Sequence, residues 1–205
     1  MKKANAAVIT PEFVISFPQI FEPDPNFGGY SFVMLFDPED PELKAFIAAA
    51  VGVAEKAFGK EWKAKGIKLP IGRGESRTNE AGQVYAGFEG KIYCNCRSKV
   101  APNGIDVAGN PLTPENIYSG AICKARVVFF AYDTRGNKGV GCAPTSLLKL
   151  RDGEPLGPGA TDPTKDFEDV LESYKAKALD SLEASEAPGI QGSEPAGPAE
   201  EPLPF

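Results

Sequence analysis

Reactive side chains are few in this sequence, and the missing types narrow the chemistry that it can do. The chain has no histidine, which is the commonest general base in enzymes and the commonest zinc ligand. Ser-His and Cys-His nucleophile pairs are ruled out for the same reason. The hydrolytic enzymes that depend on these groups are therefore excluded, and we expect a protein that is not an enzyme.

The cysteines are the second group with reactive chemistry. They are Cys94, Cys96, Cys123 and Cys142, and this spacing lacks the two-residue gap that lets two neighbouring thiolates share one metal ion. Cytosolic thiols also seldom form stable disulfides. We therefore expect four reduced thiols buried in a core, with a structural zinc site as the less favoured alternative, and we predict no bound metal and no cofactor.

Three aspartates, Asp106, Asp133 and Asp152, could hold magnesium in a carboxylate-dependent nuclease. They stand in turn-like sequence, where short acidic side chains accept hydrogen bonds from nearby backbone amides. Turn chemistry is the better explanation. The Ile-Gly-Arg-Gly-Glu run at 71–75 is superficially like a phosphate-binding loop but lacks the Gly-Lys-Ser/Thr ending, so nucleotide hydrolysis is not supported.

Cations and rings share one face of two expected strands, 91–97 and 121–132. Strict alternation gives that face Lys91, Tyr93, Asn95 and Arg97 on the first strand and Lys124, Arg126, Val128, Phe130 and Tyr132 on the second. Cationic groups neutralise phosphates, and planar side chains stack on unpaired bases. These faces predict a surface for a single-stranded nucleic acid, although exposed strands also carry charges and rings as ordinary cross-strand pairs.

A basic loop is expected between residues 60 and 82, where cations alternate with glycines around Trp62, which we expect to be a core residue. This loop and the two strand faces make up the predicted nucleic-acid site. Its residues are Lys63, Lys65, Lys68, Arg73, Arg77, Lys91, Tyr93, Arg97, Lys99, Lys124, Arg126, Phe130, Tyr132 and Lys138. Gly139 and Gly141 are interpreted as allowing tight curvature of the sheet.

The elements that must position these residues are mostly strands. Short runs rich in Phe, Tyr, Val and Ile predict strands at 13–17, 30–36, 84–88, 91–97, 121–132, 138–142 and 147–150. One helix is predicted from Leu43 to Phe58, because apolar residues recur there at helical spacing after a proline-containing acidic turn and before Gly59. The protein is therefore predicted to be mainly β with an inserted helix.

Charge divides the chain into two parts of opposite sign. Residues 1–151 carry 19 Lys+Arg against 15 Asp+Glu, a net charge of +4, whereas residues 152–205 carry 3 against 13, a net charge of −10. A basic body with an acidic tail is typical of a protein that binds a polyanion and carries a competitor for the same groove. The alternative is a solubilising tail whose last residue is incidental.

The same composition predicts the domain organisation. We expect a folded domain at 1–157, a linker with a possible helix at 158–187, and a disordered acidic tail at 188–205 that ends in Phe205. Glu200, Glu201 and the terminal Phe205 are predicted to bind a partner protein, the ring in an apolar pocket and the carboxylate in a basic clamp. No apolar run is long enough to cross a bilayer, so a cytoplasmic location is expected.

Several segments, taken in order, resemble a phage-encoded single-stranded-DNA-binding family with an oligonucleotide/oligosaccharide-binding fold, or OB-fold. The matching pieces are Ser-Phe-Pro-Gln-Ile-Phe-Glu-Pro at 16–23, Tyr-Ser-Gly at 118–120, Val-Val-Phe-Phe-Ala-Tyr at 127–132, Gly-Asn-Lys-Gly-Val-Gly at 136–141, and Leu-Arg-Asp-Gly at 150–153 with Leu-Gly at 156–157. The final Glu-Glu-Pro-Leu-Pro-Phe is similar to the acidic tails of replicative single-strand binders. The chain departs from the family pattern at 69–75, so that Arg73 is carried over with the least support.

The resemblance implies a five-stranded OB-fold-like barrel and single-stranded DNA as the ligand. Together with the residue patterns, it predicts a non-enzymatic, sequence-independent binder that serves phage DNA replication, recombination and repair in the host cytoplasm. Replication or recombination proteins would be recruited through the tail, and homo-oligomerisation is left open. The alternative is a protein-interaction or virion-assembly barrel that does not bind nucleic acid.

Overall fold

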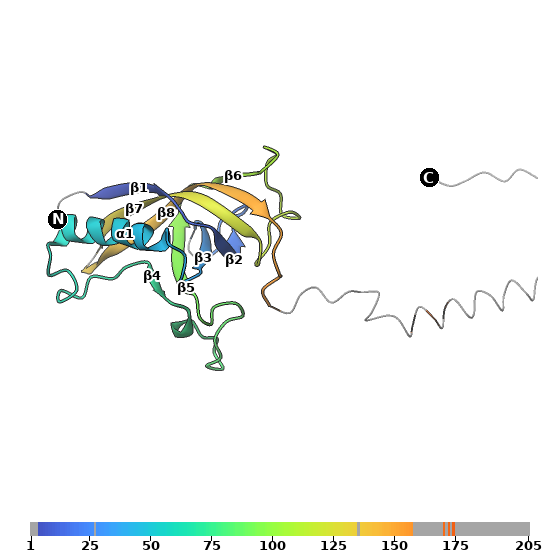
Figure 1. The fold of residues 1–205 in the computed structure, drawn as a ribbon, viewed down its shortest axis with the longest axis horizontal. Helices are drawn as coiled ribbons and strands as arrows, with labels where there is room; N and C mark the ends of the chain where they lie inside the picture. The colour runs from blue at the N-terminus through green and yellow to red at the C-terminus, as the bar shows by residue number, and fades with distance from the viewer. Residues whose placement is uncertain are drawn as a thin grey trace, which may run out of the picture. The chain divides into compact units, whose positions relative to one another are not determined.

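The computed structural model describes residues 4–157 except Phe27 and Arg135, together with Val170, Glu172 and Tyr174 (Figure 1). The chain forms two units, Met1–Gly159 and Ala160–Phe205. The three described residues of the second unit are helical and fall within 158–187, where a linker with a possible helix is expected. The rest of that helix and the predicted tail, with Glu200, Glu201 and Phe205, lie outside the described residues. Of the helices described, none has the length and apolarity to cross a bilayer.

Five long strands form the body of the first unit. They are β2 (Phe13–Gln19), β3 (Tyr30–Phe36), β5 (Ile92–Ser98), β7 (Ile122–Thr134) and β8 (Asn137–Arg151), and the shorter strands are β1 (Asn5–Ile9), β4 (Ile71–Arg73) and β6 (Asn103–Asp106). All belong to one sheet in the order β4-β5-β3-β2-β7-β8-β6, and β1 also pairs with β7. The pairs are antiparallel except β6 with β8.

The sheet curls into a barrel, because β5 and β8 stand at opposite ends of the five long strands and yet meet. The Sγ atoms of Cys96 on β5 and Cys142 on β8 lie 3.2 Å apart. The segment before β4 also joins these strands: the Val140 N–H donates to the Lys68 carbonyl at 2.8 Å, and the Asn95 N–H donates to the Pro70 carbonyl at 2.9 Å. The predicted mainly β, OB-fold-like five-stranded barrel with an inserted helix is confirmed, with three short strands added.

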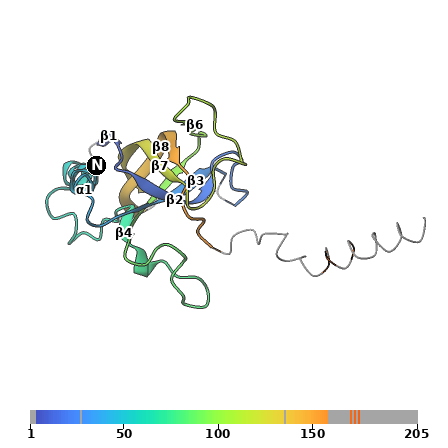
Figure 2. The same ribbon diagram turned by 45° about the vertical axis from the view of Figure 1, so that its right-hand side comes forward.

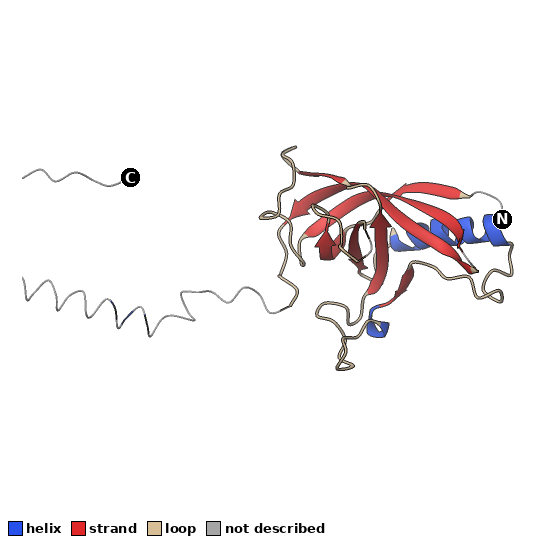
Figure 3. Ribbon diagram, turned by 180° about the vertical axis from the view of Figure 1, so that it is seen from behind, coloured by secondary structure: helices blue, strands red, loops and turns tan. Residues whose placement is uncertain are grey.

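The inserted helix, α1 (Leu43–Phe58), packs against β1, β7 and β8 on one side of the barrel (Figure 3). It follows Asp40, whose carboxylate accepts a hydrogen bond from the Glu42 N–H at 2.7 Å. The helix ends at Gly59, which has a φ of 90° that favours glycine. Its buried face includes Phe46, whose ring centroid lies 5.1 Å from that of Phe129 on β7. The helix predicted from the apolar spacing is confirmed.

A second, smaller apolar cluster lies on the outer face of β3. Its buried members are Val33, Leu35 and Phe88. Phe88 belongs to the 74–91 loop, which joins β4 to β5 and extends from the barrel next to β4 (Figure 2). Because Phe88 is fully buried, this loop is anchored on the barrel and covers part of the β3 and β5 surface.

Two predictions about this region need correction. Residues 84–88 form no strand, because Gly87 has a left-handed φ of 79° and the chain turns to insert Phe88 into the second cluster. The basic loop predicted at 60–82 is correct only in part: residues 60–66 form turns, but Ile71–Arg73 form β4, and the segment just before it joins β5 to β8. Ile67, Leu69 and Ile71 pack on the main core, and their alternation is the sequence signal for this segment.

The remaining differences concern strand boundaries. The expected strands at 138–142 and 147–150 are one strand, β8, which contains Pro144 next to a register shift in the β7–β8 pairing. Proline is tolerated at such irregularities because it has no N–H to contribute to the ladder. Strands β1 and β6 were not predicted, and both are short segments at the margins of the sheet.

Candidate nucleic-acid interface

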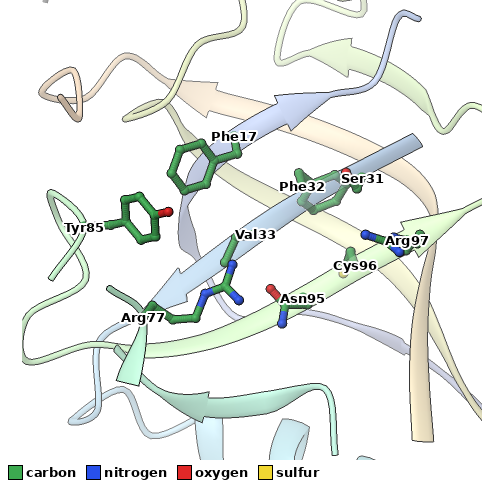
Figure 4. Close-up of a pocket in the computed structure, with 9 residues that line it drawn as sticks. All are labelled: Phe17, Ser31, Phe32, Val33, Arg77, Tyr85, Asn95, Cys96 and Arg97. Atoms are coloured by element: carbon green, nitrogen blue, oxygen red, sulfur yellow. The ribbon is translucent and has the colours of Figure 1, made fainter. Parts of the chain in front are cut away.

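A pocket opens on the outer face of β2, β3 and β5 beside the 74–91 loop (Figure 4). Phe17 and Tyr85 lie together at one end, and their ring centroids are 5.3 Å apart in an edge-to-face arrangement. Arg77 lies below them, and Asn95 and Arg97 continue along β5 to the other end. The pocket therefore combines two rings with two guanidinium groups and an amide.

Phe17 reaches this pocket because the backbone of β2 is irregular there. The register of β2 against β3 shifts between Ser16 and Gln19, and Phe17 has a φ of 49°. A left-handed conformation is strained for a bulky residue, and such strain concentrates at functional sites. A bulge also redirects a side chain out of the normal alternation. As a result, 49% of the Phe17 surface remains exposed.

Arg77 is held in place by an aromatic ring of the barrel. Its guanidinium carbon lies 5.4 Å from the ring centroid of Tyr93, a distance at which the cation is attracted to the ring face. Tyr93 itself packs against Phe88 with ring centroids 6.4 Å apart. Among the described residues, the Arg77 Nε is a buried donor without a hydrogen-bond partner.

A second pocket adjoins the first where β5 meets β8. Asn95 and Arg97 line both pockets, and the second adds Lys99, Phe130 and Tyr132. The two pockets thus share one wall, and we call the combined surface the groove. It runs from the Phe17 and Tyr85 rings, past Asn95 and Arg97 of β5, to the Phe130 and Tyr132 rings.

Each predicted aromatic residue faces a glycine on the neighbouring strand. Phe130 pairs with Gly141, Tyr132 with Gly139, and Tyr93 with Gly72. A Cβ atom on Gly141 would lie 2.5 Å from Phe130 Cζ, one on Gly139 would lie 2.6 Å from the Tyr132 hydroxyl oxygen, and one on Gly72 would lie 2.8 Å from Tyr93 Cζ. These glycines leave room for rings against the backbone. That packing, rather than curvature alone, explains Gly139 and Gly141.

The structure brings six of the predicted site residues to the groove or its margin. Arg77, Arg97, Lys99, Phe130 and Tyr132 line it, and Tyr93 supports Arg77. Lys68 and Lys138 lie close to it, because Lys68 pairs with Gly139 and Lys138 forms an ion pair with Asp133 at 3.4 Å at the start of β8. Phe17 and Tyr85 were missed as site residues, since neither follows the alternation of a regular strand.

The other predicted cations lie elsewhere. Lys65 donates to the Phe58 carbonyl at 2.8 Å and so completes the end of α1, and Lys63 lies over the Trp62 ring. Trp62 is buried in the main core, as expected. Arg126 is exposed on β7 opposite Ile9 of β1, and Arg73 is exposed at the end of β4.

Lys91 and Lys124 are paired with acids near the start of α1. Lys91 lies 3.5 Å from Asp37, and Lys124 lies 3.5 Å from Glu42. The pKa of Asp37 is below its ordinary value because the Glu39 N–H donates to its carboxylate and because Lys91 is close. Both lysines therefore sit in a locally acidic region away from the groove, although alternation places them on the expected strand faces.

The three aspartates considered as magnesium ligands each have partners within the protein. Asp106 accepts hydrogen bonds from the Asn110 side chain and backbone and from the Ala108 N–H, and these bonds lower its pKa. Asp133 pairs with Lys138, and Asp152 lies 2.7 Å from Lys149. The turn interpretation is confirmed for Asp106 alone, since Asp133 lies at the end of β7 and the partners of Asp152 are side chains.

All four cysteines are buried, as expected. Burial raises the pKa of Cys123 to about 12. Burial also raises the pKa values of Cys94 and Cys96, whereas hydrogen bonds from these two thiols lower that of Cys142.

The chain resembles known phage proteins in sequence and in fold. The family model described as the Enterobacter phage Enc34 ssDNA-binding protein matches residues 6–178. The solved single-stranded DNA-binding protein from bacteriophage Enc34 is 22% identical, with a TM-score of 0.58 over 78% of this chain and 88% of that one. The same phage protein in complex with ssDNA gives 20% identity and a TM-score of 0.58 over 74% of this chain and 89% of that one.

A second phage protein shares the fold. Gp2.5, a single-stranded DNA binding protein encoded by bacteriophage T7, is 15% identical, with a TM-score of 0.54 over 80% of this chain and 94% of that one. No curated protein matches the sequence.

Proposed function

The chain belongs to the family of the Enterobacter phage Enc34 ssDNA-binding protein, and from that premise we propose that it binds single-stranded DNA in the groove without sequence preference. The observation that carries the proposal is that Asn95 and Arg97 line both pockets and so join them into one groove. Each pocket also offers a pair of rings. A relative of the same fold was solved in complex with ssDNA, which supports the ligand class.

Each part of the groove has a role in this proposal. Arg77, Arg97 and Lys99 neutralise phosphates, and each phosphate contact releases counterions. Phe17 and Tyr85 at one end and Phe130 and Tyr132 at the other stack on bases, at about 1–3 kcal/mol per stacked base. Because every base has a π-face, stacking of this kind tolerates any sequence.

We propose no catalytic step. The role is to cover and protect unpaired DNA during phage replication, recombination and repair in the host cytoplasm. The acidic tail at 188–205 would compete with DNA for the groove, since it carries Glu194, Glu200 and Glu201. Its terminal Phe205 would recruit replication or recombination proteins.

A salt series with labelled oligo-dT tests the proposal. Fluorescence anisotropy should show binding that weakens as salt rises. Arg97→Ala and Lys99→Ala should each weaken binding and reduce the salt slope by about one unit. Lys124→Ala is the matched control, because Lys124 lies outside the groove beside Glu42, and it should leave both quantities unchanged.

Two outcomes would defeat the proposal. Binding that is absent or insensitive to salt would remove the electrostatic basis, and equal losses in the Lys124 and Arg97 variants would place DNA elsewhere. If oligonucleotides do not bind and a stable protein partner is captured instead, the protein-interaction or virion-assembly alternative takes its place.

A further inference from the structure

Three of the four cysteines converge inside the barrel, although the sequence separates them. Cys94 and Cys96 point inward from β5, and Cys142 points inward from β8. Their sulfur atoms all lie within 4.8 Å of one another, and the Cys96 and Cys142 sulfurs are 3.2 Å apart. The side chains are at most 3% exposed. The curl of the sheet brings together a Cys-x-Cys pair and a cysteine 46 residues from Cys96.

The spacing of these sulfurs suits a metal ion. A metal–sulfur distance of about 2.3 Å places three sulfurs around one ion about 4 Å apart, which falls within the observed separations. The thioether sulfur of the buried Met34 lies 4.0 Å from the Cys96 sulfur and adds a soft donor. Thiolate and thioether ligands select soft, thiophilic ions such as Cu(I) and Zn(II).

The site also has an access route. Cys142 and Cys96 each line one of the two pockets that form the groove. The sulfurs themselves point into the barrel and are almost unexposed, so an ion that enters from the groove would pass between β5 and β8 by local opening of the strands.

We propose that Cys94, Cys96 and Cys142 bind one thiophilic d10 metal ion, Zn(II) or Cu(I), that fastens β5 to β8. The sulfurs lie inside the barrel rather than on the groove surface, so metal binding can be measured in the absence of DNA. Each cysteine that coordinates as thiolate loses its thiol proton to solvent and gives its electron pair to the metal, so that no redox change occurs. The ion would link two strands that stand at opposite ends of the five long strands in the sheet order, and should therefore stabilise the barrel.

The full-length protein, stripped of metal with a chelator and kept reduced with a non-thiol reductant, is titrated anaerobically with Cd(II). Thiolate-to-cadmium absorption in the ultraviolet should rise and saturate at one equivalent, with proton release and a higher melting temperature. Zn(II) and Cu(I) are then added to the cadmium-loaded protein. Cu(I) should displace cadmium, and Zn(II), which binds thiolates more weakly than Cd(II), is also titrated into a separate metal-free sample; saturation at one equivalent with a higher melting temperature supports the site for that ion.

Cys142→Ala should lose the saturable absorption and the rise in melting temperature. Cys123→Ala is the matched control, because Cys123 is an equally buried thiol outside the cluster, and it should keep both. Far-ultraviolet circular dichroism checks that each variant is folded, and Cys94→Ala is a second variant if Cys142→Ala does not fold. Absence of saturable absorption in the wild-type protein overturns the proposal, as does undiminished absorption in a folded Cys142 or Cys94 variant.

Discussion

At the scale of single residues, the groove depends on rings that rest directly on neighbouring backbone. Phe130 is 36% exposed and lies over Gly141, so one side of the ring is supported and part of its surface is available to a ligand. Tyr93 has a different role, because Arg77 and Phe88 pack against it. Position on the correct strand face is therefore insufficient to make a ring a stacking platform.

Phe130→Ala should weaken oligo-dT binding by about 1–3 kcal/mol, since one stacking platform is lost. Anisotropy at fixed salt measures the change. Val128→Ala is the matched control, because it shortens an apolar side chain two residues away on the same face of β7. A groove role for Phe130 is contradicted if the two variants bind DNA equally well.

Gly141→Ala should weaken DNA binding although it removes no aromatic residue. The added Cβ would lie 2.5 Å from Phe130 Cζ, so the ring must move from its present position. The same anisotropy titration measures the loss, and circular dichroism checks the fold. DNA affinity equal to that of the wild type would show that the ring does not need this position.

Cys123 should make the folded state sensitive to alkaline pH. Burial raises its pKa from 9.0 to about 12, so the folded protein keeps a proton that the unfolded chain releases. The stabilisation of the folded state by the retained Cys123 proton is fully present below pH 9, and it is lost as the pH rises toward 12. Urea unfolding should show the stability advantage of the wild type over Cys123→Ala shrinking across that range. A pH-independent difference would contradict the shifted pKa.

At the scale of elements, α1 contains a residue that weakens it. Gly52 is exposed within the helix, and a Cβ added there meets no atom within 4 Å among the described residues. Gly52→Ala should raise the free energy of unfolding by about 0.5–1 kcal/mol, because alanine loses less backbone entropy in a helix. Urea denaturation measures the change. A decrease would mean that the glycine serves a contact beyond this chain.

The elements that the sequence predicts well are those with a strong internal pattern. Helix α1 shows its apolar spacing and its terminal glycine, and β3 and β7 show long runs of β-forming residues. Strand β4 was missed because three residues are too few to show alternation, and β8 was divided because Pro144 usually ends a strand. Short strands take their conformation from their neighbours, which a local pattern cannot reveal.

The same limit applies to the candidate site. Alternation correctly separated buried Cys94 and Cys96 from outward Asn95 and Arg97. It identifies a strand face but not the position along a twisted strand, so Lys124 was grouped with Phe130 although it lies beside Glu42. The irregular Phe17 has no signature in the pattern, because its direction depends on a bulge.

At the scale of the whole molecule, the acidic tail should compete with DNA for the basic groove, because the two parts of the chain carry opposite charge. Truncation from Pro188 removes Glu194, Glu200 and Glu201 and should tighten oligo-dT binding at low salt, because fewer anions compete for the groove. The gain should disappear at high salt, where such attractions are screened. Anisotropy of the full-length and truncated proteins across the salt series measures both effects.

A full-length variant separates charge from the terminal ring. Glu200→Gln with Glu201→Gln should reproduce part of the gain in affinity, whereas Phe205→Ala should leave DNA affinity unchanged. Equal affinities of the truncated and full-length proteins at low salt would refute competition by the tail.

Gly141 and Gly139, which face Phe130 and Tyr132, help to recognise this kind of surface in other chains. Aromatic residues are common in sheets for many reasons. A glycine required on the neighbouring strand opposite the ring is a much more restrictive sequence pattern. Distant members of the family can therefore be compared at the strand positions opposite these rings. A residue larger than glycine at such a position would mark a lineage whose ligand contacts have moved.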